Sequence, residues 1–356
     1  MTEARHEEAL KTLEQSFGDR VKRGPVRGEV LSTEGALASV LPMNAEEVRL
    51  IAEVAGRFSV PLVALGGETV AEAAAEKDSI LVRFDLMRRT RMPQAEELWA
   101  EAEPGVSWLQ LDDELRIQGR GLAVYPTSAP RATVGGWLAM DGLGVGSFEY
   151  GWLSENVLSA SVVLPGGELV EVVGEEVRSF VGPGGSGIVV GAKLRTRRTD
   201  ADVPFGAAFG SASELTRAVA GMVEAGLPLW HLALLNPGMA HARNLGEVFL
   251  LFGAYPAERG GKVEGGLRSV VASSRGRVLP AADAYRAWGE RFFPVTPSIL
   301  PPQIPILSRE IVSLGELAEK LSEAEGHPGH AVQGTVARSG EVLLLILEDH
   351  NEGSAR

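Results

Sequence analysis

Apolar residues recur along the chain with two different periods, which separate expected helices from expected strands. Across residues 4–17 they return every three or four positions, as on one face of a helix. A second helix is expected over residues 44–56, with Asn44 as its N-cap. Residues 61–65 and 80–84 are instead short apolar runs typical of buried strands. The pattern therefore predicts helices packed on a sheet in the first part of the chain.

The next part of the chain reads as strands joined by tight turns. Residues 98–103 alternate between apolar and polar positions, and residues 107–115 form an expected helix capped by Ser107. Residues 156–172 contain two apolar stretches separated by Pro-Gly-Gly, which predicts a β-hairpin. These strands would hold the glycine-rich loops between them on a rigid sheet.

After residue 204 the order strand, helix, strand, strand occurs twice. The first set covers residues 205–209, 213–225, 228–235 and 247–254, and the second covers residues 309–313, 314–324, 330–337 and 341–348. Two such sets predict an antiparallel, ferredoxin-like sheet with helices on one face.

Glycines and small hydroxyl side chains concentrate between residues 125 and 151. Glycine allows positive φ angles and close approach of the backbone to a bound group. Thr127, Ser128 and Thr133 add hydroxyls that do not crowd such a group. This combination suits a flat, polar ligand; the alternative is a glycine-rich α/β domain that binds nothing.

Composition narrows the possible functions. The 356 residues are 45% hydrophobic, enough for two domains with separate cores. A net charge of −13 argues against a nucleic-acid partner, which requires a basic face. The charged N-terminus and the lack of a long apolar run predict a cytoplasmic protein without a transmembrane segment, and the few Asn and Gln residues hint at a thermophilic source.

The chain has no cysteine, which excludes disulfides, thiolate nucleophiles and iron–sulfur ligation. Any redox chemistry must therefore use an organic cofactor.

The order of motifs resembles a known family. Glu103-Pro-Gly-Val, Pro126 through Gly136, Tyr150-Gly151, Asn156-Val157 and Val163-Leu-Pro-Gly-Gly167 are similar to the FAD-binding module of the vanillyl-alcohol oxidase and p-cresol methylhydroxylase type. The resemblance implies an α+β fold: a two-subdomain FAD-binding module over residues 1–199, divided at about residue 92, and a shortened ferredoxin-like cap domain over residues 200–356.

The family's pyrophosphate loop has the form Gly-Gly-x-Thr-Ser-x-x-Gly, and this chain keeps Gly66, Gly67 and Thr69. It has Val70 in place of the hydroxyl residue and Ala73 in place of the last glycine. Glu68 would also bring a carboxylate beside a dianion, which weakens binding unless the side chain turns away or pairs with an arginine.

The resemblance implies FAD as cofactor, held without a covalent bond because the loop lacks a histidine and the chain lacks cysteine. We expect the backbone of residues 133–136 and of the loop 142–146 to line the flavin ring. The implied FAD-binding residues are Gly66, Gly67, Thr69, Pro126, Thr127, Ser128, Thr133, Val134, Gly135, Gly136, Gly142, Gly144, Gly146, Tyr150, Gly185, Gly187 and Ile188.

Two residues are candidates for chemistry on a substrate. Trp288-Gly-Glu-Arg291 resembles the Trp-x-x-Arg of 2-hydroxyacid dehydrogenases, in which arginine can grip a carboxylate; the alternative is an arginine on a helix surface. His241 lies in an expected loop, where catalytic groups are common, whereas His231 has the apolar neighbours of a core histidine. His327-Pro-Gly-His330 lacks further ligands, so we expect a turn and no metal site.

The resemblance implies an FAD-dependent dehydrogenase that oxidises a small 2-hydroxy acid such as glycolate or lactate and passes electrons onward, with a partner subunit as one candidate acceptor. One alternative is a non-catalytic subunit that keeps the fold within a larger dehydrogenase complex. Another is a reductase of the cell-wall precursor type with the same flavin module.

Overall fold

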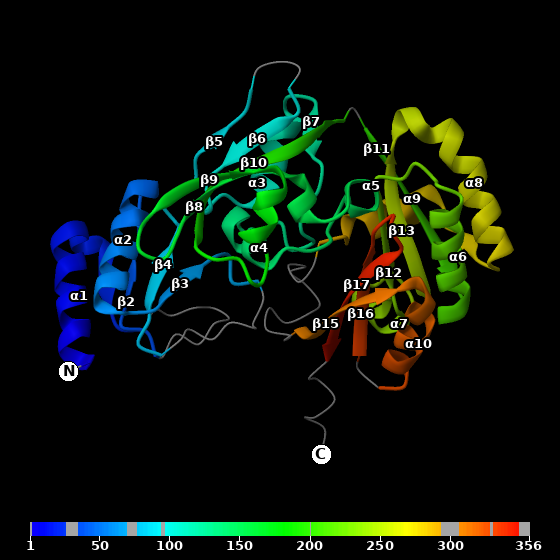
Figure 1. The fold of residues 1–356 in the computed structure, drawn as a ribbon. Helices are drawn as coiled ribbons and strands as arrows, with labels where there is room; N and C mark the ends of the chain where they lie inside the picture. The colour runs from blue at the N-terminus through cyan, green and yellow to red at the C-terminus, as the bar shows by residue number, and fades with distance from the viewer. Residues whose placement is uncertain are drawn as a thin grey trace. The chain divides into compact units, whose positions relative to one another are not determined.

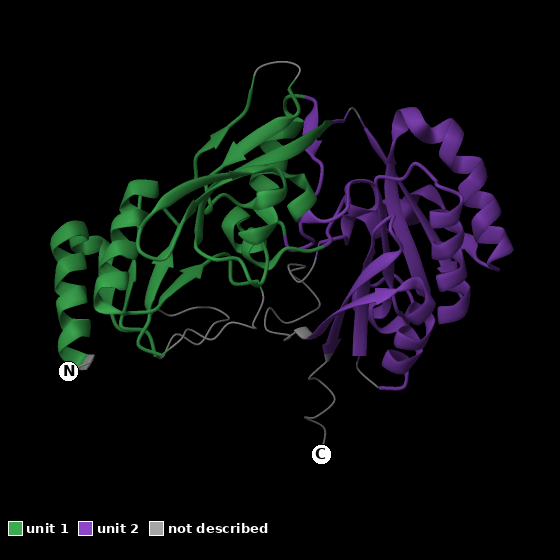
Figure 2. Ribbon diagram, in the orientation of Figure 1, with its two compact units in different colours: residues 1–118, 129–142, 154–197 green, residues 119–128, 143–153, 198–356 purple. Residues whose placement is uncertain are grey.

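The computed structural model describes residues 2–25, 35–69, 77–93, 97–199, 201–292, 306–327 and 330–348. They form two compact units (Figure 2). The first comprises Met1–Gln118, Ala129–Gly142 and Ser154–Arg197, and the second comprises Gly119–Ser128, Leu143–Leu153 and Arg198–Arg356. The expected domain boundary after residue 199 stays a prediction, and the compact units differ from it because two short segments of the first 199 residues pack with the C-terminal part.

The first unit begins with a small sheet covered by two helices (Figure 1). Its strand order is β1-β2-β4-β3, with β2, β4 and β3 parallel. The apolar faces of the helices pack on this sheet, and the Asn44 side chain caps the second helix by accepting from the Glu47 N–H at 3.0 Å. The elements are α1 (Thr2–Phe17), η1 (Gly18–Arg20), β1 (Val21–Arg23), β2 (Ala38–Val40), α2 (Ala45–Phe58), β3 (Leu62–Leu65) and β4 (Ile80–Arg83).

A second, antiparallel sheet of the first unit runs in the order β5-β6-β10-β8-β9. The predicted hairpin is present as β8 and β9, and its turn places Gly166 and Gly167 at φ angles of 99° and 93°. The elements are β5 (Thr90–Arg91), β6 (Trp99–Ala102), α3 (Trp108–Arg116), α4 (Val134–Met140), η2 (Leu153–Asn156), β8 (Val157–Val163), β9 (Leu169–Val173), η3 (Gly174–Ser179) and β10 (Ile188–Arg198).

The second unit is built on an antiparallel sheet in the order β14-β11-β13-β12-β16-β17-β15. Both predicted sets of strand, helix, strand, strand are present, joined edge to edge by β12 and β16. The elements are β7 (Arg120–Leu122), α5 (Ser147–Tyr150), β11 (Asp202–Phe209), α6 (Ala212–Glu224), β12 (His231–Leu235), α7 (Pro237–Ala242), β13 (Phe249–Pro256), η4 (Ala257–Arg259), α8 (Gly260–Ser273), β14 (Arg277–Val278), α9 (Ala281–Gly289), β15 (Ile306–Ser313), α10 (Leu314–Glu325), β16 (His330–Val336) and β17 (Glu341–Glu348).

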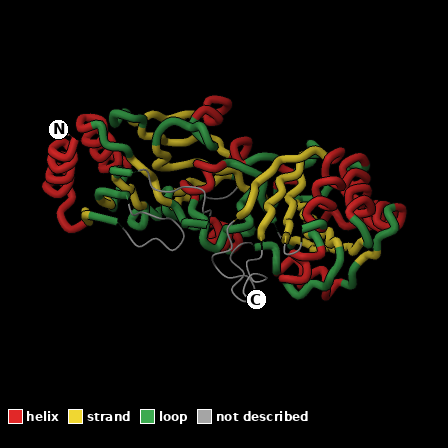
Figure 3. Tube along the Cα trace, turned by 90° about the horizontal axis from the view of Figure 1, so that it is seen from below, coloured by secondary structure: helices red, strands yellow, loops and turns green. Residues whose placement is uncertain are grey.

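Both faces of this sheet are covered, which differs from the expectation of helices on one face. Alternate strand residues point to opposite faces, so Leu232 and Leu234 join the core beneath α6, α8 and α10. Figure 3 shows helices packed alongside the strands of this sheet. Ala233 and Leu235 instead face α7 and α9. The two shorter helices therefore bury the second face, and the histidine that begins β12 lies on it.

Two segments from the glycine-rich region are fixed within the second unit. Tyr125 and Val145 exchange two backbone hydrogen bonds of 3.0 and 2.7 Å. The Trp230 Nε1 donates to the carbonyl oxygen of Ala123 at 3.1 Å. Arg259 forms a two-pronged ion pair with Glu149, with both N–O distances 2.9 Å. These long-range bonds explain why residues 119–128 and 143–153 belong to the second unit.

Candidate functional site

The first unit contains a polar cavity of about 500 Å³, within the range typical of small-molecule sites. It lies beside the predicted pyrophosphate loop and is lined by three arginines and two carboxylates. A side chain from α3 and hydroxyl groups on the adjoining loops complete the polar lining. The charged lining residues are Arg83, Arg88, Arg131, Glu68 and Asp85, and the polar ones include Ser107, Gln110 and Thr133.

The two glycines of this loop sit where no side chain fits. A Cβ on Gly67 would lie 1.9 Å from the Arg131 carbonyl oxygen, and one on Gly66 would lie 2.9 Å from the Gly136 Cα. Both glycines also line the cavity, with cationic side chains beside them. Backbone N–H groups and arginines are the partners that a phosphate group requires, so the residues present fit the diphosphate of FAD.

Glu68 lines the same cavity and has a positive φ of 50°. Arg83 contacts Asp85 with an N–O distance of 3.1 Å, so part of the positive charge is already neutralised. Val70 and Ala73, the two other departures from the family's loop, lie outside the described residues.

Residues 133–136 form the start of helix α4. The Thr133 side chain caps this helix by accepting from the Gly136 N–H at 3.3 Å. A Cβ on Gly135 would lie 2.7 Å from the Pro104 Cβ, so this glycine is needed for packing inside the protein. The expected contact of these residues with a flavin ring stays a prediction.

The other predicted FAD-binding residues are divided between the two units. The first unit also contains Thr69, Val134, Gly142, Gly185, Gly187 and Ile188, whereas the second contains Pro126, Thr127, Ser128, Gly144, Gly146 and Tyr150. Two of the glycines have positive φ angles and no room for a side chain. A Cβ on Gly187 would lie 2.6 Å from the Val163 carbonyl oxygen, and one on Gly146 would lie 2.0 Å from that of Ala123.

Arg291 lies at the centre of an aromatic cluster in the second unit. Its guanidinium carbon is 4.5 Å from the ring centroid of Trp288 and 4.1 Å from that of Phe292. The Nε donates to the Tyr125 hydroxyl at 3.3 Å, and Nη1 donates to the Trp288 carbonyl oxygen at 2.9 Å. The described part of the chain offers no partner for Nη2. The guanidinium is therefore fixed on one side and open at its far end.

His231 belongs to the same cluster. It is 1% exposed, and its ring centroid lies 5.8 Å from that of Trp288. The Gly146 N–H donates to its Nδ1 at 3.4 Å. Burial, and then the positive charge of Arg291, lower the pKa of His231 to about 3, so its ring is neutral at physiological pH.

A second buried arginine supports the segment that carries Arg291. Arg243 donates to the Gln333 side-chain oxygen at 2.7 Å and to the carbonyl oxygen of Glu290. Burial lowers the pKa of Arg243 to about 10, so it keeps its charge at physiological pH. These bonds connect the end of α7 and strand β16 to the residue before Arg291.

His241 lies elsewhere on the surface of the second unit. Its side chain is 70% exposed, and Nδ1 lies 3.2 Å from an Oε1 of Glu247, which is itself exposed. No contact with the Arg291 cluster is found for it within the described ranges.

The two histidines of the predicted turn stack on each other, with ring centroids 4.9 Å apart. Across the ranges that the structure describes, no group of three or more His, Cys, Asp or Glu side chains could hold a metal ion. No helix in those ranges has the length and apolar character that a membrane crossing requires.

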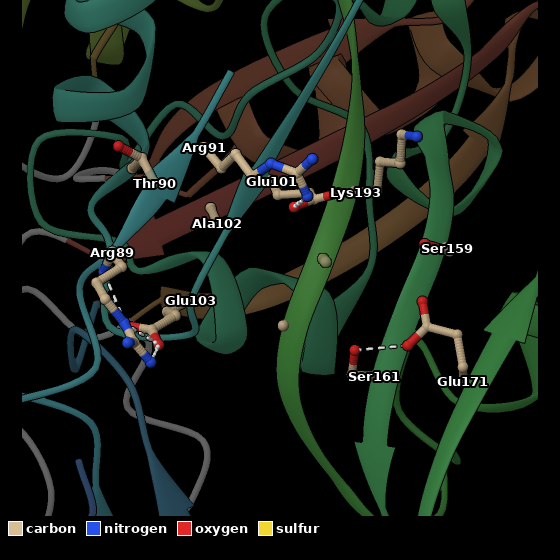
Figure 4. A pocket seen from close by; sticks show the side chains of 12 residues that line it. Arg89, Thr90, Arg91, Glu101, Ala102, Glu103, Ser159, Ser161, Glu171 and Lys193 are labelled. Carbon is tan, nitrogen blue, oxygen red and sulfur yellow. Dashed lines mark hydrogen bonds and ion pairs between the residues drawn. The ribbon is translucent and has the colours of Figure 1, made fainter. Parts of the chain in front are cut away.

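A second cavity of about 340 Å³ lies on the open face of the sheet β5-β6-β10-β8-β9 (Figure 4). Its charged groups largely neutralise one another: Arg89 pairs with Glu103 at 2.7 Å, and Arg91 pairs with Glu101 at 3.1 Å. Lys193 packs over the Trp99 ring at 4.0 Å. This surface has no set of groups directed at one ligand, so we do not assign it a function.

Sequence reasoning missed several residues of these sites. Arg83, Arg88 and Arg131 were not singled out, although each lies within a few residues of a glycine motif or strand end. His231 was read as a core residue, and it is buried as expected, but beside Arg291. Tyr125 directly precedes the Pro126 motif, which was the available signal.

Comparison with known proteins identifies an FAD-binding domain in the chain. Residues 36–173 match the family described as FAD binding domain. The D-lactate dehydrogenase [cytochrome] of Arabidopsis thaliana is 31% identical over 156 residues, which cover 43% of this chain and 27% of that protein. The D-2-hydroxyglutarate dehydrogenase of Pseudomonas putida is 31% identical over 176 residues, which cover 46% of this chain and 18% of that protein. The matched segment thus spans less than a third of either relative.

Two solved structures superpose on nearly the whole chain. Alkyldihydroxyacetonephosphate synthase superposes with a TM-score of 0.74 at 16% identity, covering 96% of this chain and 76% of that one. p-Cresol methylhydroxylase superposes with a TM-score of 0.73 at 12% identity, covering 98% and 84%. At these identities the likeness concerns the fold, and it agrees with the α+β architecture predicted from the motifs. Residues 36–173 therefore form an FAD-binding domain, and the chain as a whole shares the fold of these two solved structures.

Proposed function

We propose that this protein is an FAD-dependent dehydrogenase that oxidises a small 2-hydroxy acid such as glycolate or lactate. The observation that carries the proposal is the environment of Arg291. Two aromatic rings, a tyrosine hydroxyl and a backbone carbonyl hold the guanidinium in one orientation. A carboxylate can bind its open end in a two-pronged contact, the geometry for which arginine is suited.

The similarity to a D-lactate dehydrogenase and a D-2-hydroxyglutarate dehydrogenase supports this substrate class. The substrates in both names are small acids with a hydroxyl beside the carboxylate. A fixed arginine would bind that shared part and would leave the rest of the molecule to set specificity.

When bound, FAD supplies the acceptor for the hydride that leaves the hydroxyl-bearing carbon. The chain's own part is to hold the acid in one orientation and to keep water from its charged end. Trp230, Trp288 and Phe292 provide the apolar surroundings in which an arginine–carboxylate contact is strongest. We propose non-covalent attachment of FAD, with the arginine-lined cavity of the first unit as the diphosphate site.

A second candidate function is a non-catalytic subunit of a larger dehydrogenase complex. The specific observation in its favour is Glu68, a carboxylate that lines the cavity in which a dianion would bind. In that case the protein would keep the fold and lose tight FAD binding. A partner subunit that carries electrons onward is compatible with both functions.

The test is anaerobic reduction of the FAD-loaded protein. Glycolate, D-lactate, L-lactate and D-2-hydroxyglutarate should each be mixed with it, and bleaching of the flavin absorption should be followed. Propionate, which lacks the hydroxyl, is the matched control and should not bleach the flavin. Bleaching by at least one hydroxy acid supports the dehydrogenase function. Failure of the protein to take up FAD supports the function of a non-catalytic subunit.

A further inference from the structure

The side chain of His231 has one nitrogen committed to the protein. The Gly146 backbone N–H donates to Nδ1 at 3.4 Å, and a backbone N–H can only donate. Nδ1 must therefore carry its lone pair. Because a neutral imidazole has one ring proton, that proton is on Nε2.

The surroundings keep this tautomer neutral. The ring is buried between Phe252, at a centroid distance of 6.3 Å, and Trp288, at 5.8 Å. The nearby charge is the Arg291 guanidinium, which disfavours a second proton on the ring. Nε2 is thus the donor of this ring. It could accept a proton only if the ring proton moved to Nδ1, and that move would break the hydrogen bond from Gly146.

His231 and Arg291 contact the same tryptophan. The Arg291 guanidinium carbon lies 4.5 Å from the Trp288 ring centroid, and the His231 ring lies 5.8 Å from it. Across the described ranges, no protein acceptor is found for the Nε2–H of His231. A hydrogen-bond donor close to a fixed cation favours an anionic oxygen as its partner.

We propose that His231 binds the substrate together with Arg291, donating a hydrogen bond from Nε2–H to an oxygen of the bound 2-hydroxy acid anion. The inference rests on the proposed function and adds a residue to it. It assigns His231 as a hydrogen-bond donor and not as the base that removes the substrate's proton. The competing role is purely structural, in which His231 only holds the Gly146 loop.

Two substitutions separate these roles. In His231→Asn the side-chain oxygen can take the place of Nδ1 and accept from Gly146, but no donor stands where Nε2 was. In His231→Gln the amide nitrogen can take the place of Nε2, but the acceptor for Gly146 is lost. Each variant therefore keeps one of the two hydrogen bonds.

The measurement is the equilibrium dissociation constant of oxalate, a non-oxidisable dicarboxylate, from FAD-loaded protein by calorimetry. The thermal unfolding midpoint is followed in parallel. We expect His231→Asn to weaken oxalate binding about tenfold with a midpoint near that of the wild type, and His231→Gln to stay within about threefold of wild-type affinity. The KM for the hydroxy acid should follow the same order.

Wild-type affinity in His231→Asn, or a larger loss in His231→Gln than in His231→Asn, would overturn the donor role and leave the structural one. Those results would not affect the proposed function, because the wild type would still bind oxalate and be reduced by a hydroxy acid. A wild-type protein that neither binds oxalate nor is reduced would overturn both proposals.

Discussion

The Nε of Arg291 donates to the hydroxyl of Tyr125 across 3.3 Å, although 166 positions separate the two residues in the chain. Tyr125 lies within the FAD-binding domain match, whereas Arg291 follows helix α9 and lies outside that match. The contact builds one site from two distant regions of the sequence.

Replacing Arg291 should impair substrate binding without affecting the cofactor. Loss of a charge-assisted, two-pronged contact costs about 1.5–3 kcal/mol, so Arg291→Ala should lower kcat/KM for the hydroxy acid about ten- to a hundredfold. Arg291→Lys should recover only part, because an ammonium group cannot grip both oxygens. Flavin content should match that of the wild type in both variants.

The matched control is Arg286→Ala on the neighbouring helix. Arg286 is 60% exposed and forms a surface ion pair with Asp283, so its loss should leave kcat/KM within a factor of two. An equal loss of kcat/KM in Arg291→Ala and Arg286→Ala would mean that Arg291 acts through long-range electrostatic attraction and not through a specific contact.

Tyr125→Phe should weaken the site by a smaller amount. The change removes the acceptor for Nε but keeps a ring of almost the same volume in a position that is 1% exposed. Arg291 would keep its other contacts, so we expect the KM to rise about three- to tenfold, equivalent to about 1 kcal/mol. Steady-state kinetics at saturating FAD measures the KM, and an unchanged value would show that Arg291 is oriented without the Tyr125 hydroxyl.

Gly67→Ala should disrupt the cofactor site. Its Cβ would collide with the Arg131 carbonyl oxygen at 1.9 Å, so the loop must move away from the cavity lining. We expect the dissociation constant of FAD, measured by fluorescence quenching, to rise at least tenfold. Gly265→Ala, in helix α8 with open space around the added carbon, is the control; it should keep FAD affinity and stabilise the fold by about 0.5–1 kcal/mol.

Gly135→Val should lower both FAD binding and the stability of the fold. The added side chain would strain against Pro104 inside the first unit, so the expected loss of FAD would come with a lower unfolding midpoint. A variant that loses FAD at an unchanged midpoint would instead favour direct contact with the flavin.

His231 should make stability depend on pH. Its pKa is lowered to about 3 in the folded protein from an ordinary value of 6.5. Below pH 6.5 the unfolded chain binds a proton that the folded protein does not. The contribution of neutral His231 to the free energy of unfolding is therefore complete above pH 6.5. It decreases toward pH 3 by about 1.4 kcal/mol per pH unit. His231→Asn has no titrating ring, so the stability advantage of the wild type over it should shrink by about 2 kcal/mol between pH 7 and pH 5 in urea unfolding. Parallel pH curves for the two proteins would show that His231 titrates normally.

The amino-acid sequence by itself determined the helix caps, the hairpin turn and the identity of the cofactor, FAD. Asn44 and Ser107 cap the helices that they were expected to cap, because capping depends on a few neighbouring residues. The Pro-Gly-Gly turn gave the β8–β9 hairpin for the same reason. The FAD-binding motifs could be read because their glycines follow one another in a fixed order over a short stretch.

Only the tertiary structure decided how the cluster around Arg291 is assembled. It placed residues 119–128 and 143–153 in the second unit, covered the second face of the sheet with α7 and α9, and left His241 at the surface. It also brought His231, read as a core histidine, beside Arg291 and Gly146. Several of these outcomes depend on contacts between residues far apart in the chain, such as Gly146 and His231, which are separated by 85 positions. No local pattern of apolar or polar residues encodes which distant segments will pack together.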